Sequence, residues 1–267
     1  NMNINLKFLL LGTSLSLIPT LTYAQCTTTP DCAAMGYKET TNKGGCLKCP
    51  TGNGWYCPQP KEEKAVLGEC TGYAKNCAIG QILNSDGTCS NDKVSGKTPI
   101  AVVVYIGSDN CGYAMTASPI ATGVAWSTSS IDISGLPNYA GMSAAEKDFD
   151  VIGNMQKIIQ EGNSNAYPAA WTAVNYAPST APETKGKWVL PSAGVLYKLD
   201  TNIDTINNTI SKLGGQQITG YKKYIWSSSE NSRSHVWAFC SSSAFVIEAV
   251  IKSYSGSSYQ VWPVIEF

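Results

Sequence analysis

Eight of the ten cysteines crowd into the first third of the chain, and this distribution limits what that part can fold into more than any other feature. Residues 25–96 contain no long periodic apolar segment and consist mainly of turn-forming residues and cysteines. Such a segment buries too little apolar surface to hold a fold by itself, so cross-links must stabilise it. The crowded cysteines are Cys26, Cys32, Cys46, Cys49, Cys57, Cys70, Cys77 and Cys89.

Two further cysteines, Cys111 and Cys240, stand apart from this group. An even count favours disulfides formed in an oxidising compartment. For Cys111 and Cys240 the sequence leaves three alternatives open: a bridge between an early and a late strand, two buried or unpaired thiols, or a redox pair. Cys46 and Cys49 have the spacing of two zinc ligands, but export and the absence of a nearby His argue against a metal there.

Residues 1–24 have the pattern of a secretory signal peptide. Lys7 precedes an apolar run from Phe8 to Leu21, and small residues at Thr22 and Ala24 suit cleavage after Ala24. A short buried helix is the alternative. Beyond residue 24, every apolar run is far shorter than the ~20 residues that a membrane-spanning helix needs. The sequence predicts an exported protein of the periplasm, cell surface or extracellular space, without a transmembrane segment after cleavage.

The charge pattern narrows the class of partner. Nineteen basic and nineteen acidic residues cancel, and no long basic run is present. Nucleic acid requires a basic footprint, so we expect no nucleic-acid partner. Charged residues are only 14% of the chain, whereas it has fourteen Tyr and seven Trp. This balance is typical of an exported β-rich domain or of a surface that recognises a protein or cell-surface ligand through aromatic anchors.

Residues 98–267 carry the regular patterns of a folded domain. A β-branched run predicts a buried strand at 100–106, and a second strand is expected at 112–116. A capping box at Ser143 and the apolar face after it predict a helix that ends at Gly162. A further helix begins near Ser192, breaks at 200–202, and continues to Gly214. Short strands over 224–267 complete an α+β domain, whose terminal strands we expect to pair.

Three stretches in this domain stand in a distinctive order. They are Lys187–Ala193, Tyr224–Glu230 followed by Trp237, and the closing Val261–Phe267. In this order and spacing they resemble the bacterial C-type-lectin-like domains. That group includes the fibrobacter succinogenes major domains, relatives of the formylglycine-generating enzyme, and variable receptor proteins of diversity-generating retroelements. Trp262 departs from the pattern, because the family usually has Arg before the last Pro.

The resemblance implies a C-type-lectin-like ligand-binding domain over residues 98–267, in which a long C-terminal segment presents side chains on one face. In the retroelement receptors, adenine-directed mutagenesis diversifies this segment at Asn codons. Of residues 231–259 here, only Trp237, Glu248 and Lys252 cannot be reached from such a codon. The single Arg and the single His of the chain, Arg233 and His235, both lie in this segment.

We therefore expect a binding face in which small polar residues mix with aromatic ones, as in antibody paratopes. The alternative interpretation is that these are ordinary turn and edge-strand residues. Core positions are expected at Trp188, Trp226, Trp237 and Trp262. The candidate ligand-binding residues are Asn231, Ser232, Arg233, Ser234, His235, Ser253, Tyr254, Ser255, Ser257, Ser258 and Tyr259.

Enzymatic chemistry has few candidate residues. His235 is the single possible histidine base, and no Gly-x-Ser-x-Gly elbow surrounds a serine. The calcium-ligating triplets of sugar-binding lectins are missing, and we expect no metal or cofactor. A formylglycine-generating type of enzyme would need Cys111 and Cys240 as reactive thiols. The sequence instead predicts an exported, non-enzymatic adhesion or ligand-binding protein of the retroelement-diversified kind, with a non-binding structural envelope protein as the main alternative.

Overall fold

The computed structural model describes residues 47–48, 55–56, 64–218, 223–240 and 246–267. The chain divides into two compact units, Asn1–Glu62 and Glu63–Phe267. In the first unit, β1 (Leu47–Lys48) pairs antiparallel with β2 (Trp55–Tyr56). The predicted signal peptide and the bridges expected for Cys26, Cys32, Cys46, Cys49 and Cys57 lie outside the described residues.

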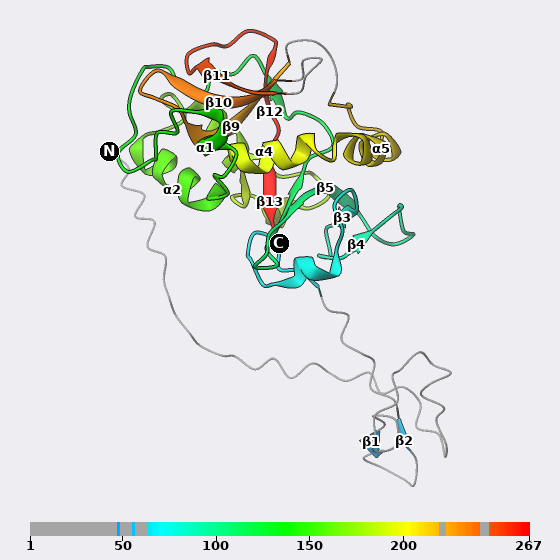
Figure 1. Ribbon diagram of the computed structural model, residues 1–267. Coiled ribbons are helices and arrows are strands. Elements are labelled where there is room, and N and C mark those ends of the chain that lie inside the picture. Colours follow the sequence, from blue (N-terminus) through cyan, green and yellow to red (C-terminus); the bar gives the residue numbers. More distant parts are fainter. Residues whose placement is uncertain (1–46, 49–54, 57–63, 219–222, 241–245) are drawn as a thin grey trace. The chain divides into compact units, whose positions relative to one another are not determined.

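The second unit mixes helices with two sheets (Figure 1). The six-stranded sheet has the order β4 (Cys89–Ser90), β3 (Ile82–Asn84), β5 (Pro99–Ile106), β6 (Gly112–Met115), β13 (Val264–Glu266), β8 (Trp188–Val189). The five-stranded sheet has the order β11 (Val246–Ile251), β10 (His235–Cys240), β9 (Tyr224–Glu230), β12 (Tyr259–Val261), β7 (Ala121–Thr122). The helices are η2 (Tyr73–Asn76), α1 (Met142–Ala145), α2 (Val151–Glu161), α3 (Pro168–Asn175), η3 (Pro182–Thr184), α4 (Ala193–Asp200) and α5 (Ile203–Leu213).

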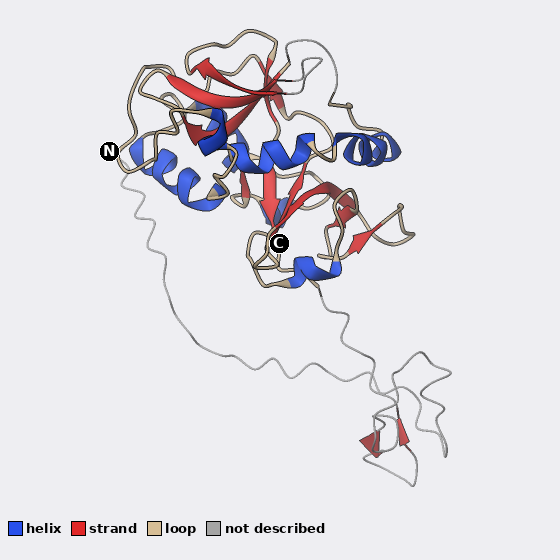
Figure 2. Cartoon of the chain, in the orientation of Figure 1, coloured by secondary structure: helices blue, strands red, loops and turns tan. Residues whose placement is uncertain are grey.

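Helix α4 lies between the two sheets (Figure 2). It contacts β5 of the six-stranded sheet and β9, β10 and β11 of the five-stranded one. Its side chains Val195, Leu196 and Leu199 are therefore buried, whereas Tyr197 is partly buried. Gly194 allows the helix to approach the Asp148 carbonyl closely, because a Cβ atom there would lie 2.4 Å from that oxygen. The helix predicted after Ser192, with its break before α5, is confirmed.

Strand β5 is buried on both faces, which explains its continuous apolar run. Val102 and Val104 face the main core between the sheets, whereas Ala101 and Val103 face a second cluster on the other side. A strand covered on both faces has no polar side to alternate with. The predicted buried strand at 100–106 and the second strand at 112–116 are both confirmed. The late strand β13 pairs with the early strand β6, as expected for the terminal strands.

Residues 64–96 belong to the larger unit, whereas the sequence placed a module boundary near residues 96–98. Strand β3 pairs antiparallel with β5, with Ile82 opposite Val102. Leu67 packs in the second cluster, on the outer side of the six-stranded sheet. The compact unit therefore begins at Glu63. Residues 64–96 lack the periodic apolar pattern of a core because they complete a core that other segments provide.

Two disulfides tie this segment to the sheet. Cys70 bonds to Cys111 at a sequence separation of 41, and Cys77 bonds to Cys89 at a separation of 12. The alternative bridge between Cys111 and Cys240 is therefore wrong. Cys240 lies at the end of β10 as a buried thiol. Disulfides of this kind fit an exported protein.

The capping box at Ser143 does not start the long helix. Helix α1 is a short turn that begins after Gly141 without a side-chain cap. Helix α2 begins only at Val151, and the Asp150 side chain caps it by accepting a hydrogen bond from the Gly153 amide at 2.9 Å. It ends at Gly162, as predicted. The delay has a physical cause in the intervening Asp148, whose buried side chain accepts hydrogen bonds from Asn154 of α2 and from Ser229 of β9.

Asp148 joins two of the three stretches on which the family resemblance rests. Its carboxylate accepts hydrogen bonds from Asn154 at 2.7 Å and from the Ser229 hydroxyl at 2.5 Å. Its backbone carbonyl accepts a hydrogen bond from the Ser192 hydroxyl at 2.6 Å. The Ser229 hydroxyl oxygen in turn accepts from the Ala193 amide at 2.7 Å. Ser192, Ala193 and Ser229 of these two stretches are therefore part of the buried framework of the domain.

We predict that residues 64–267 fold as one unit. The disulfide that closes the longer loop, Cys70–Cys111, should stabilise this unit more than Cys77–Cys89 does. Replacing Cys70 and Cys111 with Ser should lower the free energy of unfolding by about 4 kcal/mol, because the loop that the bridge closes is long. The matched Cys77→Ser/Cys89→Ser variant should lose about 3 kcal/mol, because its loop is shorter. Urea denaturation of the 64–267 fragment measures both. A fragment of residues 98–267 with the same stability would contradict the boundary at Glu63.

Candidate recognition face

The five-stranded sheet brings the two parts of the predicted binding segment together. Strands β9 and β10 are antiparallel and are joined by residues 231–234. Strands β10 and β11 are also antiparallel, with His235 opposite Ile251. The chain therefore leaves β11 beside the β9–β10 turn, where the Lys252 amide donates to the Ser234 carbonyl at 3.0 Å. Residues 231–235 and 253–259 are called here the recognition face.

Residues 253–258 return along the sheet from one end to the other. They must do so because β12 runs parallel to β9, with Tyr259 opposite Tyr224 at the start of both strands. At one edge of this path the Gly123 amide donates to the Tyr259 carbonyl at 2.9 Å. The rings of Tyr254 and Tyr259 approach with centroids 5.8 Å apart. The crossing segment is thus anchored at both ends and near β7.

An aromatic stack lies under the crossing segment, and sequence reasoning missed it. Tyr259 stacks on Tyr224 with centroids 5.0 Å apart and on Trp226 with centroids 4.9 Å apart. The Trp226 ring nitrogen donates to the Val124 carbonyl at 2.7 Å, which fixes the ring. Burial raises the pKa of the Tyr224 and Tyr259 phenols, so both stay neutral hydrogen-bond donors. The sequence contains a sign of this stack, because Tyr224 and Trp226 are two residues apart in a predicted strand and therefore lie on the same face of it.

A buried ion pair between Glu230 and Lys252 lies at the end of the sheet where the two parts of the recognition face meet. Only 0% and 1% of these side chains are exposed. Lys252 also donates to the Ile131 carbonyl at 2.6 Å and lies 5.0 Å from the centroid of the Trp126 ring. Burial lowers the pKa of Lys252 and raises the pKa of Glu230, and their mutual attraction opposes both shifts.

The ion pair and its neighbours hold the connection formed by residues 126–139 against the sheet. The Ile133 amide donates to the Glu230 carboxylate at 3.4 Å, and the Tyr139 amide donates to the Glu230 carbonyl at 2.9 Å. Trp237 is 5% exposed, and its ring nitrogen donates to the Tyr139 carbonyl at 2.9 Å. Buried polar contacts of Glu230, Lys252 and Trp237 therefore hold the framework beneath the recognition face in place.

The candidate binding residues differ in exposure. Arg233, Ser253, Tyr254, Ser255 and Ser257 are exposed. The half-buried candidates are Asn231, Ser232, Ser234, His235, Ser258 and Tyr259. Tyr254 is 46% exposed, one of the few large side chains with an exposed apolar surface. The structure brings residues 231–235 and Ser253 to one end of the sheet, whereas Tyr259 lies at the other end, and the role of all these residues in binding stays a prediction.

The half-buried candidates have structural contacts of their own. The Asn231 amide donates to the Tyr139 carbonyl at 3.0 Å. His235 Nδ1 lies 2.9 Å from the Ser234 hydroxyl. Arg233 is exposed, although its Nε donates to the Ser130 carbonyl at 3.0 Å.

The expected core tryptophans Trp188, Trp226, Trp237 and Trp262 are all buried, as predicted.

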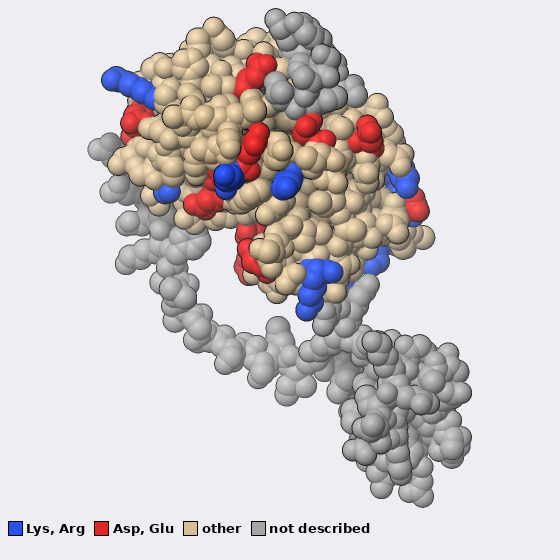
Figure 3. Space-filling model, in the orientation of Figure 1, with Lys and Arg blue, Asp and Glu red and all other residues tan. Residues whose placement is uncertain are grey.

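The electrostatic surface has no single dominant sign. Figure 3 shows Lys, Arg, Asp and Glu scattered over the visible side of the described residues, without a block of one charge. In the described part of the chain, no group of three His, Cys, Asp or Glu side chains could hold a metal ion. No helix among the described residues is long and apolar enough to cross a membrane. The two thiols that the enzymatic alternative needs are not together, since Cys111 bonds to Cys70.

The comparisons with known proteins are sparse. No family model matches the chain, and no curated protein matches it. The crystal structure of a fimbrial protein from Bacteroides ovatus superposes with a TM-score of 0.46 and 14% sequence identity. The superposition covers 71% of this chain and 48% of the fimbrial protein, so the chain spans about half of that protein's length. A likeness at this level assigns neither a fold family nor a function.

We predict that the ion pair is essential to the stability of the recognition face. Lys252→Met should lower the free energy of unfolding by about 3–5 kcal/mol, because it leaves the Glu230 charge buried without its partner. Adding Glu230→Gln to that variant should recover much of the loss, since the buried charge is then removed. Urea denaturation at neutral pH measures both.

Lys147→Met is the matched control. Lys147 is exposed, so this substitution should change stability by no more than about 0.5 kcal/mol. If Lys252→Met were as mild as the control, the pair would not hold the face in place.

Proposed function

We propose that this is an exported, non-enzymatic adhesion or ligand-binding protein that displays its recognition face to a protein or cell-surface target. The domain is of the C-type-lectin-like kind in this proposal, and its C-terminal segment is diversified by a retroelement. The protein acts at the cell surface or outside the cell. Its signal peptide, removed on export, is residues 1–24.

The division of residues 231–259 between framework and surface carries this proposal. Of the residues in the segment that an Asn codon cannot give, Trp237 and Lys252 are buried, at 5% and 1% exposure. The third, Glu248, is half-buried and accepts a hydrogen bond from the Tyr224 hydroxyl at 3.4 Å. Each of the three therefore has a framework contact. All five exposed candidates, by contrast, are residue types that such a codon can give.

This arrangement suits a surface whose specificity changes while its fold does not. Substitutions at exposed positions usually change the free energy of unfolding by no more than about 0.5 kcal/mol. Substitution of a buried tryptophan or of one partner in a buried ion pair costs far more. Tyr and Arg on such a surface provide large contact area and directed hydrogen bonds, and serines provide adaptable ones. Arg233, Tyr254 and the exposed serines provide these three kinds of contact.

We predict that binding and folding can be separated on this face. The Arg233→Ala/Tyr254→Ala variant should keep its free energy of unfolding within about 1 kcal/mol, because both side chains are exposed. Its affinity for a target captured with the unsubstituted protein should fall at least about thirtyfold, since Arg and Tyr are typical hot-spot residues. Trp237→Ala should instead lose about 3–5 kcal/mol of stability as a buried aromatic.

Thermal melts and binding isotherms of the two variants, run side by side, make the comparison. A double variant that unfolds while Trp237→Ala stays native would mean that the assignments of core and face are reversed. A folded double variant that binds as tightly as the parent would remove these residues from the binding face. Failure to capture any target would favour the alternative of a structural envelope protein.

The diversification has a separate test in the neighbouring DNA. We expect a near-copy of the codons for residues 226–260 with Asn where this chain has Ser, Tyr, His or Arg, next to a reverse-transcriptase gene. Sequencing of the flanking region is sufficient. If that region carries neither, the face is a fixed binding surface and the retroelement part of the proposal is wrong.

A further inference from the structure

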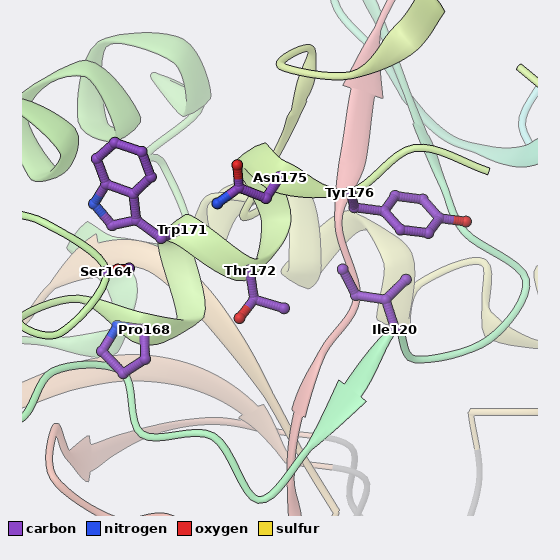
Figure 4. Close-up of a pocket in the computed structure, with 7 residues that line it drawn as sticks. All are labelled: Ile120, Ser164, Pro168, Trp171, Thr172, Asn175 and Tyr176. Carbon is purple, nitrogen blue, oxygen red and sulfur yellow. The ribbon is translucent and has the colours of Figure 1, made fainter. Parts of the chain in front are cut away.

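Two adjoining hollows lie on the larger unit, and none of their lining residues belongs to the recognition face. The first, of ≈ 380 Å³, covers the outer side of α3 and is drawn in Figure 4. The second, of ≈ 480 Å³, lies over residues 116–120 and 213–215. They share Ile120 and Tyr176 as lining residues, so together they form one continuous surface feature, called here the α3 groove. Each is within the range of roughly 300–1,000 Å³ that ligand sites occupy.

The α3 groove has no charged lining residue. Most of its lining comes from two stretches that contain no Asp, Glu, Lys, Arg or His, residues 110–131 and 162–182. Backbone hydrogen bonds join the two stretches, from the Thr128 amide to the Ala166 carbonyl at 3.0 Å and from the Ala169 amide to the Ala125 carbonyl at 3.2 Å. Helix α3 itself carries no charge on its outer side. Such a groove offers nothing to compensate the charge of an ionic ligand.

Two aromatic rings in the groove are held in place. The Trp171 ring nitrogen donates to the Gly162 carbonyl at 2.8 Å, which fixes the half-buried indole. Tyr176 packs edge-on against the buried Trp188, with ring centroids 5.2 Å apart. Figure 4 shows the two rings at opposite ends of the first hollow. Rings held in this way offer flat apolar contact surface with little loss of conformational entropy on binding.

Polar side chains lie between these rings. Figure 4 places Thr172 and Asn175 between Trp171 and Tyr176, and Ser164 also lines the hollow. Within the described residues, the structure gives the side chains of Ser164, Thr172 and Asn175 no intramolecular hydrogen bond. Their hydroxyl and amide groups are therefore available to both donors and acceptors of a ligand.

We propose that the α3 groove binds a neutral glycan. A sugar ring has C–H faces that pack on aromatic rings, and its hydroxyls pair with amide and hydroxyl side chains. The groove combines these two kinds of contact and lacks charge. The large exposed apolar side chains lie elsewhere, at Val66, Val94, Ile131, Met142 and Tyr254, so the groove lacks the apolar centre of a protein interface. This site is separate from the recognition face and does not depend on the proposed function.

The test is native affinity electrophoresis of the full chain in gels that contain one soluble polysaccharide each. Dextran, mannan and a mixed-linkage β-glucan are the neutral probes, and alginate is the acidic one. We expect retarded migration in at least one neutral gel and none in alginate. Trp171→Ala should weaken this binding by about tenfold or more. Met142→Ala, which removes an exposed apolar side chain that lines neither the groove nor the recognition face, is the control and should leave the retardation unchanged.

A second variant keeps the test informative if Trp171→Ala does not fold. Thr172→Ala/Asn175→Ala removes no intramolecular hydrogen bond among the described residues, so it should fold, and its binding should weaken severalfold. The proposal is overturned if the folded protein is not retarded in any neutral gel, if alginate alone retards it, or if both groove variants bind like the parent. It is also overturned if size-exclusion chromatography shows that Trp171→Ala turns a dimer into a monomer, because the groove would then be a contact between two copies.

Discussion

The C-terminal half of this protein depends on one buried ion pair. Glu230 ends β9, and Lys252 follows β11, so the contact between them closes the end of the five-stranded sheet. Removing both charges from water is costly, and the cost is offset by their mutual attraction together with the Ile131 carbonyl and the Ile133 amide. Loss of one partner leaves the other charge buried without compensation, so the two charges must be kept or removed together. The connection of residues 126–139 and the β9–β10 turn take their positions from the pair.

Residues 231–259 have two roles, because some of them are buried in this framework and others lie on the surface above it. Buried members such as Trp237 and Lys252 hold the sheet, while Arg233, Tyr254 and the exposed serines lie above them. The aromatic stack of Tyr224, Trp226 and Tyr259 provides a similar support at the other end of the crossing segment. Framework and surface therefore alternate within a single stretch of chain.

The sequence predicted those parts of the fold whose signals are local. The apolar run of β5, the αL glycine that ends α5 at Gly214, and the buried tryptophans could be assigned from pattern alone. Prediction from the sequence failed where a contact between residues far apart in the chain determines the local structure. Asp148 is held by Ser229 and Asn154, which delays helix α2 beyond the capping box. Cys70 reaches Cys111 only because residues 64–77 cover the outer side of the six-stranded sheet, and no cysteine spacing reveals that.

The candidate site was predictable to a similar degree. Family resemblance and the isolated Arg233 and His235 pointed to the segment, but exposure depends on the sheet register, which places His235 opposite Ile251 and half-buries it. Helix α3 and the groove over it gave no strong signal, because a short helix without charges or a clear apolar stripe resembles a loop.

Saturation mutagenesis of residues 231–259 with a protease-resistance readout of folding tests the central claim most directly. The account predicts that Arg233, Ser253, Tyr254, Ser255 and Ser257 accept most substitutions, whereas Trp237 and Lys252 accept almost none. Equal sensitivity at the two sets of positions would contradict the separation of framework from surface.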